Sequence, residues 1–199
     1  MRLIYFFVML TMASCNSRKQ VEIYYESGKI MERFQITRDS VKDGIYQAWF
    51  EDGKLYEEAA YLQGKLNGQR KIYYPNGQQE IMETYNEKGK LNGPYISWYD
   101  NGNLKTEQQY VNNVLQGVLK TYYPDGKIKE QVTMKDNQEN GPFIEYYSNG
   151  QISWKGTYLH GDNEFGLLEN YDSLGVLIRK MNCDSNAICR TIWKKEGNE

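Results

Sequence analysis

The sequence predicts an all-β fold, an elongated, twisted, single-layer antiparallel meander of about seven stacked β-hairpins. Three observations predict it. Glycine recurs in two series with steps of 24 or 25 residues, a pair of adjacent aromatic positions follows the first glycine of each unit, and turn-forming residues precede the second glycine. A fixed period of this length indicates a repeat array, in which each unit packs on its neighbours, and not one central core.

The two glycine series define the unit, because the second glycine always lies nine residues after the first. The first series is Gly44, Gly68, Gly93, Gly117, Gly141 and Gly166, and the second is Gly53, Gly77, Gly102, Gly126, Gly150 and Gly175. Glycine adopts positive φ at little steric cost, so both series are expected at turns. Asn101-Gly102 is the typical signal of a two-residue hairpin turn. Leu91-Asn92-Gly93 is expected to form a looser turn at the other side of the sheet.

Aromatic residues fill two adjacent positions in each unit. The first position holds Trp49, Tyr73, Trp98, Tyr122, Tyr146 and Tyr171, and the second holds Phe50, Tyr74, Tyr99, Tyr123 and Tyr147. Because side chains alternate along a strand, the two positions are expected to point to opposite faces of the sheet. Rings on neighbouring strands would then pair, and each pair is worth about 0.2–1 kcal/mol beyond small residues.

The N-terminus is predicted to be a signal peptide over residues 1–14. An apolar run from Leu3 to Met12 follows Arg2 and is too short to span a membrane. The run ends in Met12-Ala13-Ser14-Cys15, which resembles a bacterial lipobox. The alternative is an ordinary signal peptide with a chance cysteine.

The lipobox resemblance implies that Cys15 is lipidated and that residues 15–20 form a lipidated tether. Each methylene of an acyl chain that enters a bilayer contributes about 0.8 kcal/mol of binding free energy. Several chains together are therefore enough to hold a domain on a membrane. We therefore expect a lipid-anchored membrane protein of the bacterial cell envelope, facing the periplasm or the cell surface.

The C-terminal residues 183–199 depart from the period and are expected to cap the last hairpin. Two cysteines, Cys183 and Cys189, lie at its start, and an even count in an exported protein is compatible with a disulfide. Two free thiols are the alternative. A metal pair is disfavoured because no further cysteine or nearby histidine completes a site.

The chain shows no arrangement of residues that is typical of catalysis. Its one histidine, His160, lies in a turn segment without a nucleophile motif beside it. Carboxylates recur on the return strands and are interpreted as a solvated face opposite basic neighbours: Glu57, Glu58, Glu80, Glu83, Glu107 and Glu130. We therefore predict a non-catalytic protein with no metal and no cofactor. With 24 basic and 26 acidic residues and no sustained basic run, it is not expected to bind nucleic acid.

The repeat unit resembles the MORN repeat, specifically its bacterial variant with a G-x(4)-[WY]-[YF]-x-x-G core. That core is present here as GQRKIYYPNG, GPYISWYDNG, GVLKTYYPDG and GPFIEYYSNG. The likeness covers about residues 21–182, which we take as the repeat array. The resemblance implies membrane attachment, phospholipid contact or protein scaffolding, and related bacterial proteins are commonly described as antitoxin-like components of toxin–antitoxin systems.

These features lead to three functional hypotheses. The first is a lipid-anchored scaffold that binds a protein partner through the second aromatic row, Phe50, Tyr74, Tyr99, Tyr123 and Tyr147, because amphipathic rings are favoured at recognition surfaces. The second is glycan binding, with sugars stacked on the aromatic rows. The third is antitoxin-like neutralisation of a toxin, which the family resemblance alone implies.

Overall fold

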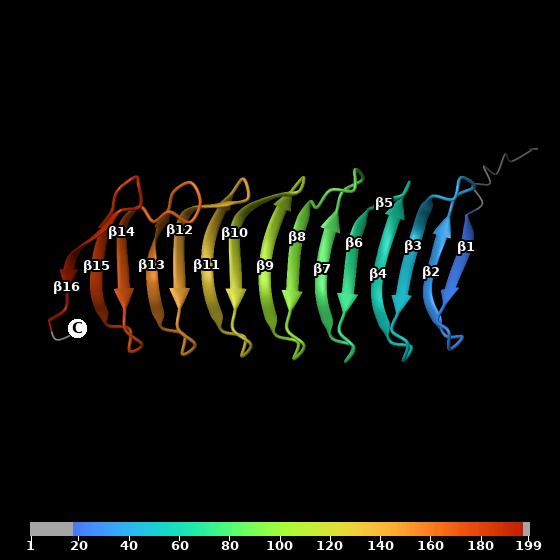
Figure 1. Cartoon of the computed structure of the whole chain (residues 1–199), viewed down its shortest axis with the longest axis horizontal. Coiled ribbons are helices and arrows are strands. Elements are labelled where there is room, and N and C mark those ends of the chain that lie inside the picture. The colour runs from blue at the N-terminus through green and yellow to red at the C-terminus, as the bar shows by residue number, and fades with distance from the viewer. Residues whose placement is uncertain (1–17, 197–199) are drawn as a thin grey trace, which may run out of the picture.

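The structure, a computed structural model, describes residues 18–196 and consists of one open antiparallel sheet, with no helix in that part of the chain (Figure 1). The strands run side by side in chain order along the long axis of the molecule. They are β1 (Lys19–Tyr24), β2 (Ile30–Ile36), β3 (Lys42–Trp49), β4 (Leu55–Leu62), β5 (Lys65–Leu66), β6 (Gly68–Tyr73), β7 (Gln79–Tyr85), β8 (Gly93–Trp98), β9 (Leu104–Val111), β10 (Val114–Tyr122), β11 (Ile128–Lys135), β12 (Gln138–Tyr146), β13 (Ile152–Tyr158), β14 (Gly166–Tyr171), β15 (Leu177–Cys183) and β16 (Cys189–Lys194).

Seven hairpins follow one another, from β1–β2 to β14–β15, so the predicted meander is confirmed. The two-residue strand β5 pairs with β4 beside β6. The segment expected to cap the array forms β16, which pairs with β15 in the plane of the sheet. It therefore covers the edge of β15 and becomes the last edge strand itself. The predicted signal peptide and Cys15 lie outside the described residues.

The turns that contain the second glycine series are longer than the Asn-Gly signal predicted. The amide of Tyr99 donates to the carbonyl of Asn103 at 2.8 Å, and the amide of Gly102 donates to the carbonyl of Tyr99 at 2.9 Å. Gly102 has a φ of +86°, whereas Asn101 has no positive φ. This is a three-residue loop, a type I turn closed by a left-handed glycine, and the prediction of a two-residue turn here was wrong.

Two-residue turns with positive φ at both positions occur at the opposite ends of the strands, where looser connections were expected. Asn112 and Asn113 connect β9 to β10 with φ values of +53° and +72°. Asp136 and Asn137 do the same between β11 and β12, at +53° and +67°. Asn and Asp tolerate this region better than other residues with a side chain, which explains why these turns contain no glycine.

The first glycine series lies within or at the ends of strands and not in turns, which corrects the prediction. Between the pairs Met134–Glu139 and Val132–Phe143, β12 contains two more residues than β11, and Gly141 is one of the residues in this bulge. Two extra residues occur in the same way wherever one hairpin pairs with the next, always in the first strand of the following hairpin, up to β14. Bulges bend the strand and increase its twist. A surplus of two also keeps the side chains on their original faces.

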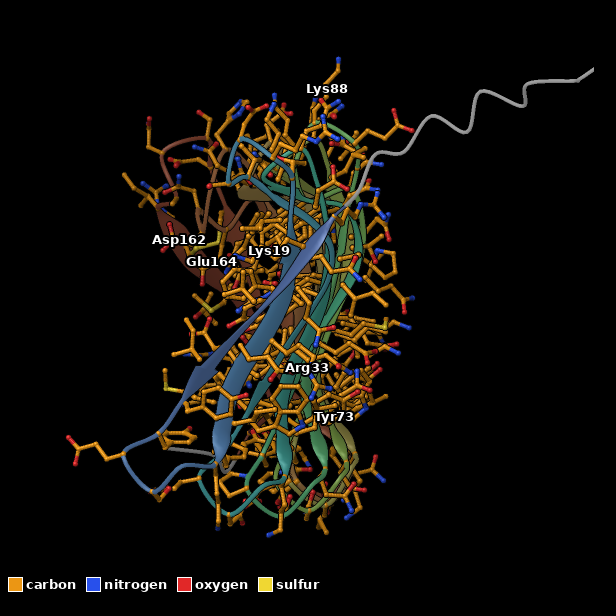
Figure 2. The ribbon with its side chains drawn as sticks, turned by 90° about the vertical axis from the view of Figure 1, so that its right-hand side faces the viewer. Lys19, Arg33, Tyr73, Lys88, Asp162 and Glu164 are labelled. Carbon is orange, nitrogen blue, oxygen red and sulfur yellow. A yellow bond between two sulfur atoms is a disulfide. The ribbon has the colours of Figure 1, made fainter. Side chains whose placement is uncertain are left out.

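The sheet has two distinct faces, seen edge-on in Figure 2. We call the one that carries the buried residues the core face. One apolar cluster lies near its N-terminal end and a second near its C-terminal end: Tyr46, Ala48 and Ala59 in the first, and Val132, Met134, Phe143, Leu168 and Cys183 in the second. On the opposite face, rings of the first aromatic position pack on charged side chains, as Trp49 does with Arg33 and Tyr171 with Lys155.

Candidate functional site

The candidate site is the second aromatic row, which lies where the first strand of each hairpin enters its turn. Its members Phe50, Tyr74, Tyr99, Tyr123 and Tyr147 are all half-buried. Tyr74 lines a cavity together with Ser97 and Gln108 of the core face. The two adjacent aromatic positions therefore serve opposite faces of the sheet, as their alternation predicted.

Each tyrosine of the aromatic row is hydrogen-bonded to the next unit. Its hydroxyl donates to the backbone carbonyl of the first aromatic residue one repeat further along. The distances are 2.9 Å from Tyr74 to Trp98, 2.7 Å from Tyr99 to Tyr122, 2.7 Å from Tyr123 to Tyr146 and 2.8 Å from Tyr147 to Tyr171. The row therefore connects neighbouring hairpins and holds its rings in fixed positions, a structural role that the sequence reasoning did not foresee.

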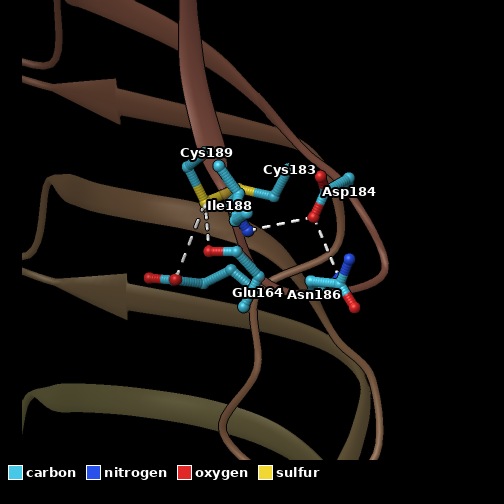
Figure 3. Close-up of a disulfide and its surroundings, with 7 residues drawn as sticks. Glu164, Cys183, Asp184, Asn186, Ile188 and Cys189 are labelled. Atoms are coloured by element: carbon cyan, nitrogen blue, oxygen red, sulfur yellow. Dashed lines mark hydrogen bonds between the residues drawn. A yellow bond between two sulfur atoms is a disulfide. The ribbon is translucent and has the colours of Figure 1, made fainter.

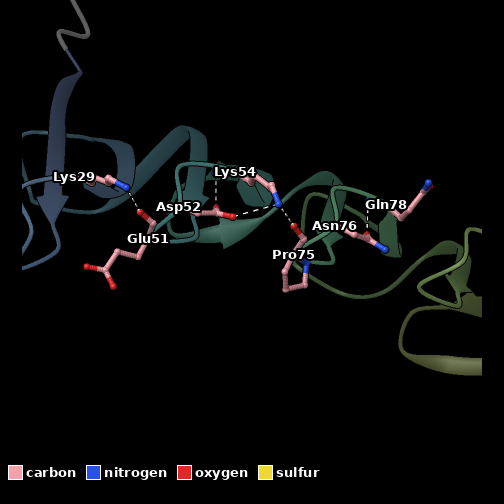
Figure 4. Close-up of polar contacts among 7 residues, drawn as sticks. All are labelled: Lys29, Glu51, Asp52, Lys54, Pro75, Asn76 and Gln78. Carbon is pink, nitrogen blue, oxygen red and sulfur yellow. Dashed lines mark hydrogen bonds and ion pairs between the residues drawn. The ribbon is translucent and has the colours of Figure 1, made fainter.

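The turns beside the aromatic row also contact one another (Figure 4). Lys29 Nζ donates to the carbonyl of Glu51 at 2.8 Å, and Lys54 Nζ donates to that of Pro75 at 2.6 Å. Further along the chain, the Asn76 side-chain amide donates to the carbonyl of Asp100 at 2.6 Å. This edge of the sheet is consequently a continuous surface in which each turn is supported by the next.

Grooves lie between successive rings of the row. The groove between Tyr74 and Tyr99 has a volume of about 490 Å³ and is also lined by Pro75, Asn76 and Asp100. A second groove of about 470 Å³ is lined by Tyr123 and Tyr147, and its further lining residues are Lys129, Glu130, Glu145, Tyr146, Ser153 and Trp154. Grooves of this size can admit side chains or small ligands.

The middle of the core face is occupied by an ion network that the sequence reasoning misjudged. Arg70 Nε lies 2.7 Å from Glu57 Oε1, and Arg70 Nη1 lies 2.9 Å from Glu83 Oε2. Burial opposes the charge of Arg70, but the hydrogen bonds to both carboxylates raise its pKa overall. Glu57 is buried, and none of the six carboxylates assigned to a solvated face is exposed. The prediction of a solvated face was wrong for Glu57, which pairs with Arg70 on the core face, whereas the other five carboxylates are half-buried.

The two C-terminal cysteines are joined in a disulfide that connects β15 to β16 (Figure 3). Cys183 is fully buried in the second apolar cluster. A Glu164 carboxylate oxygen lies 3.8 Å from Cys189 Sγ, and these three residues form the one group of possible metal ligands among residues 18–196. With both sulfurs engaged in the disulfide, the group offers no thiolate to a metal.

The single histidine lies where the sequence placed it. His160 is exposed, in the connection between β13 and β14, with a φ of +56°. None of the described residues belongs to a helix long and apolar enough to cross a membrane.

Comparison with known families identifies the repeat. The MORN repeat variant matches five consecutive segments, 42–63, 66–87, 91–112, 115–136 and 139–160, which together make up more than half of the chain. The chain belongs to the MORN repeat variant family. MORN repeats generally mediate protein or membrane interactions and are non-catalytic. A search of curated proteins found no match to the chain.

The sequence reasoning missed Lys129, Glu145, Ser153 and Trp154 of the second groove, and for Glu145 a signal was present. Glu145 is the fourth residue after the first glycine of its unit. The other units have an uncharged residue at this position: Ala48, Ile72, Ser97, Thr121 and Asn170. A single charged residue in a column of neutral ones is a departure from the repeat that a comparison of the units reveals.

Proposed function

We propose that this MORN repeat protein is a non-catalytic interaction scaffold, anchored at the bacterial cell envelope by a lipid on Cys15, and that its aromatic row binds a protein partner. The observation that carries the proposal is the pair of grooves at Tyr74–Tyr99 and Tyr123–Tyr147. Their rings are already fixed by hydrogen bonds to the next unit, so binding immobilises few side chains.

A protein partner is favoured over a glycan by the hydrogen bonding of the row. The hydroxyls of Tyr74, Tyr99 and Tyr123 donate hydrogen bonds to backbone carbonyls within the sheet. With their hydroxyls engaged, the rings offer mainly their surfaces, which suit the side chains of a protein partner. An antitoxin-like role would be one form of the same scaffold, with a toxin as the partner.

The lipid anchor is supported by the lipobox-like sequence at Cys15 and by the short distance along the chain from there to Lys19, where β1 begins. A tether of so few residues would hold the sheet close to the membrane surface. Metabolic labelling with palmitate tests this. We expect label on the wild type and none on Cys15→Ala, and an unlabelled wild type would refute the anchor.

Affinity capture with two matched triple variants tests the aromatic row. Tyr74, Tyr99 and Tyr123 changed together to Phe keep their rings and lose only their hydroxyls, whereas the same three changed to Leu lose the rings. We expect the Phe variant to capture the partner, but more weakly than the wild type because its rings are held less firmly, and the Leu variant to lose it. If the Leu variant keeps its β circular dichroism and captures the same partner equally well, the proposed surface is wrong. Co-expression with a captured partner that is toxic alone would distinguish an antitoxin role.

A further inference from the structure

The groove lined by Tyr123 and Tyr147 contains a pair of carboxylates that lie opposite each other on two adjacent strands. Glu130 of β11 and Glu145 of β12 are directly opposite in the register of the sheet. Both are half-buried, and both line the same cavity. Like charges directly opposite each other destabilise a sheet. The pair therefore needs an explanation other than folding.

The repeat itself does not require two acids at this place. The equivalent cross-strand pairs of the other units are Glu32–Ala48, Glu57–Ile72, Ile81–Ser97, Thr106–Thr121 and Trp154–Asn170. None of them contains two charged residues. Since apolar and neutral residues form the same pair elsewhere in the sheet, the Glu130–Glu145 pair is a local addition to the repeat.

The negative charge of the pair is only partly offset within residues 18–196, by the charge of Lys129 beside it. Glu57, which occupies the position of Glu130 in an earlier unit, lies 2.7 Å from Arg70 Nε, but neither Glu130 nor Glu145 forms an ion pair with a described residue. Lys129 is exposed where it lines the groove. Burial raises the pKa of Glu130, and the charge of Glu145 raises it further.

More negative charge lies nearby. Burial raises the pKa of Glu145 as well, and the charges of Glu164 and Glu139 add to this effect while Lys129 opposes it. A cation that entered the groove would therefore meet an acidic environment from more than one strand.

Aromatic side chains line the rest of the groove. Tyr123, Tyr147 and Trp154 border the same cavity as the two carboxylates. The guanidinium of Arg179 lies over the ring of Trp154, 5.2 Å from its centroid, so one ring of the groove already makes a cation–π contact within the chain. Rings beside carboxylates form the combination that recognises arginine and lysine side chains, through cation–π attraction and charge-assisted hydrogen bonds.

We propose that this groove binds a cationic side chain, arginine or lysine, of a partner protein, with Glu130 and Glu145 as its acceptors. The inference rests on the proposed function and names the chemistry of the partner at one position of the row. The charge is the basis of the assignment, because a half-buried pair of carboxylates without an ion-pair partner among the described residues is complementary to a cation. An acidic side chain would be repelled, and an apolar one would remove water from the two charges without replacing it.

Titration of the full-length protein with capped tripeptides tests the proposal. The probes are tri-arginine, tri-lysine, and tri-citrulline, which has nearly the same shape as tri-arginine without the charge. We expect the two basic peptides to shift the amide resonances of β11 and β12, and tri-citrulline to leave them unchanged. The double variant Glu130→Gln/Glu145→Gln should weaken tri-arginine binding at least tenfold. Glu87→Gln, which removes an exposed charge from a distant turn, is the matched control and should bind like the wild type.

The proposal would be overturned by the absence of a shift with either basic peptide, by equal binding of tri-arginine to the double variant, or by equal binding of tri-citrulline to the wild type. Calcium alone shifting the same resonances and displacing tri-arginine would assign a metal site instead and would also overturn it. The proposed function is judged separately, by partner capture with a Tyr74→Leu/Tyr99→Leu double variant, which changes the first groove and leaves Tyr123 and the Glu130–Glu145 groove intact. Loss of peptide binding with retained capture would reject only the cation site.

Discussion

The hydroxyl of Tyr99 donates a 2.7 Å hydrogen bond to the backbone carbonyl of Tyr122, one repeat further along the chain. Tyr74, Tyr123 and Tyr147 make the same bond in their own units. A sheet of hairpins is held together by interactions between nearest neighbours. These bonds therefore join neighbouring units in addition to strand pairing, side-chain packing and the contacts between successive turns.

Removing the hydroxyl of Tyr99 should weaken this coupling between units. Tyr99→Phe keeps the ring but leaves the carbonyl of Tyr122 without this donor, so we expect the free energy of unfolding to fall by about 1 kcal/mol. Urea denaturation followed by circular dichroism measures the change. Phe50 provides the reverse test, since it occupies the same position and its amide makes the same turn bond, 2.9 Å to Lys54. Phe50→Tyr should raise stability, and a destabilised Phe50→Tyr together with a neutral Tyr99→Phe would show that the hydroxyls do not couple the units.

The sequence was sufficient to predict the hairpin array, because the glycine period and the aromatic pairs report local structure that every unit repeats. It was not sufficient for loop length. Asn101-Gly102 suits a two-residue turn, but the same glycine also suits the last residue of a three-residue loop, and strand register decides between them. Burial was misjudged for Glu57 because its partner Arg70 comes from the next unit. The groove at Glu145 depends on the spacing of strands from two hairpins, β10–β11 and β12–β13, which no single repeat specifies.

The bulge glycine Gly141 should not tolerate a side chain. Its φ is +130°, and a Cβ there would lie 2.9 Å from Cβ of Thr133. Gly141→Ala should therefore lower the free energy of unfolding by about 2–3 kcal/mol, from backbone strain and a steric clash together. Gly150→Ala is the control, because its φ of +89° imposes strain but nothing lies within 4 Å of the added Cβ. Thermal denaturation should rank Gly141→Ala below Gly150→Ala, and the opposite order would show that the bulge relaxes freely.

Glu169, on the face opposite the core face, should make the free energy of unfolding fall at acidic pH. Hydrogen bonds from Lys155 and Tyr171, and a further one from Lys180, lower its pKa from 4.5 to about 2, although burial opposes them. Because the folded-state value is the lower one, the stabilisation is complete above pH 4.5 and is lost as the pH falls toward 2. Glu169→Gln should reduce stability by about 1 kcal/mol at pH 7 and by progressively less below pH 4.5. Denaturation of the wild type and of Glu169→Gln at several pH values measures this. If the difference in the free energy of unfolding between the two proteins does not change with pH, the ion pairs of Glu169 contribute nothing.

Reduction of the disulfide should destabilise the C-terminal end of the array. Cys183 and Cys189 close a short loop. A cross-link around a loop of this length stabilises the folded protein by roughly 2 kcal/mol, because it lowers the conformational entropy of the unfolded chain. Because stability in an array is local, dithiothreitol should increase amide hydrogen exchange in β15 and β16 and leave β3 and β4 unchanged. Cys189→Ser should reproduce the effect without reductant. Equal exchange in the oxidised and reduced protein would exclude a stabilising role for the bond.

Replacing Glu130 by Gln should stabilise the protein at neutral pH, unlike most substitutions of half-buried residues. Burial and the charge of Glu145 raise the pKa of Glu130 above its ordinary value of 4.5. The stability linked to this group is therefore present below pH 4.5 and is lost as the pH rises through the raised value. Glu130→Gln should gain about 0.5–1 kcal/mol at pH 7, where the two charges oppose each other, and nothing below pH 4.5. Glu87→Gln, an exposed control, should change little at either pH. A gain confined to neutral pH would mean that the Glu130 carboxylate lowers the stability of the folded protein, as residues at binding sites commonly do. A loss of stability at pH 7 would instead show that Glu130 has a stabilising partner in the folded protein.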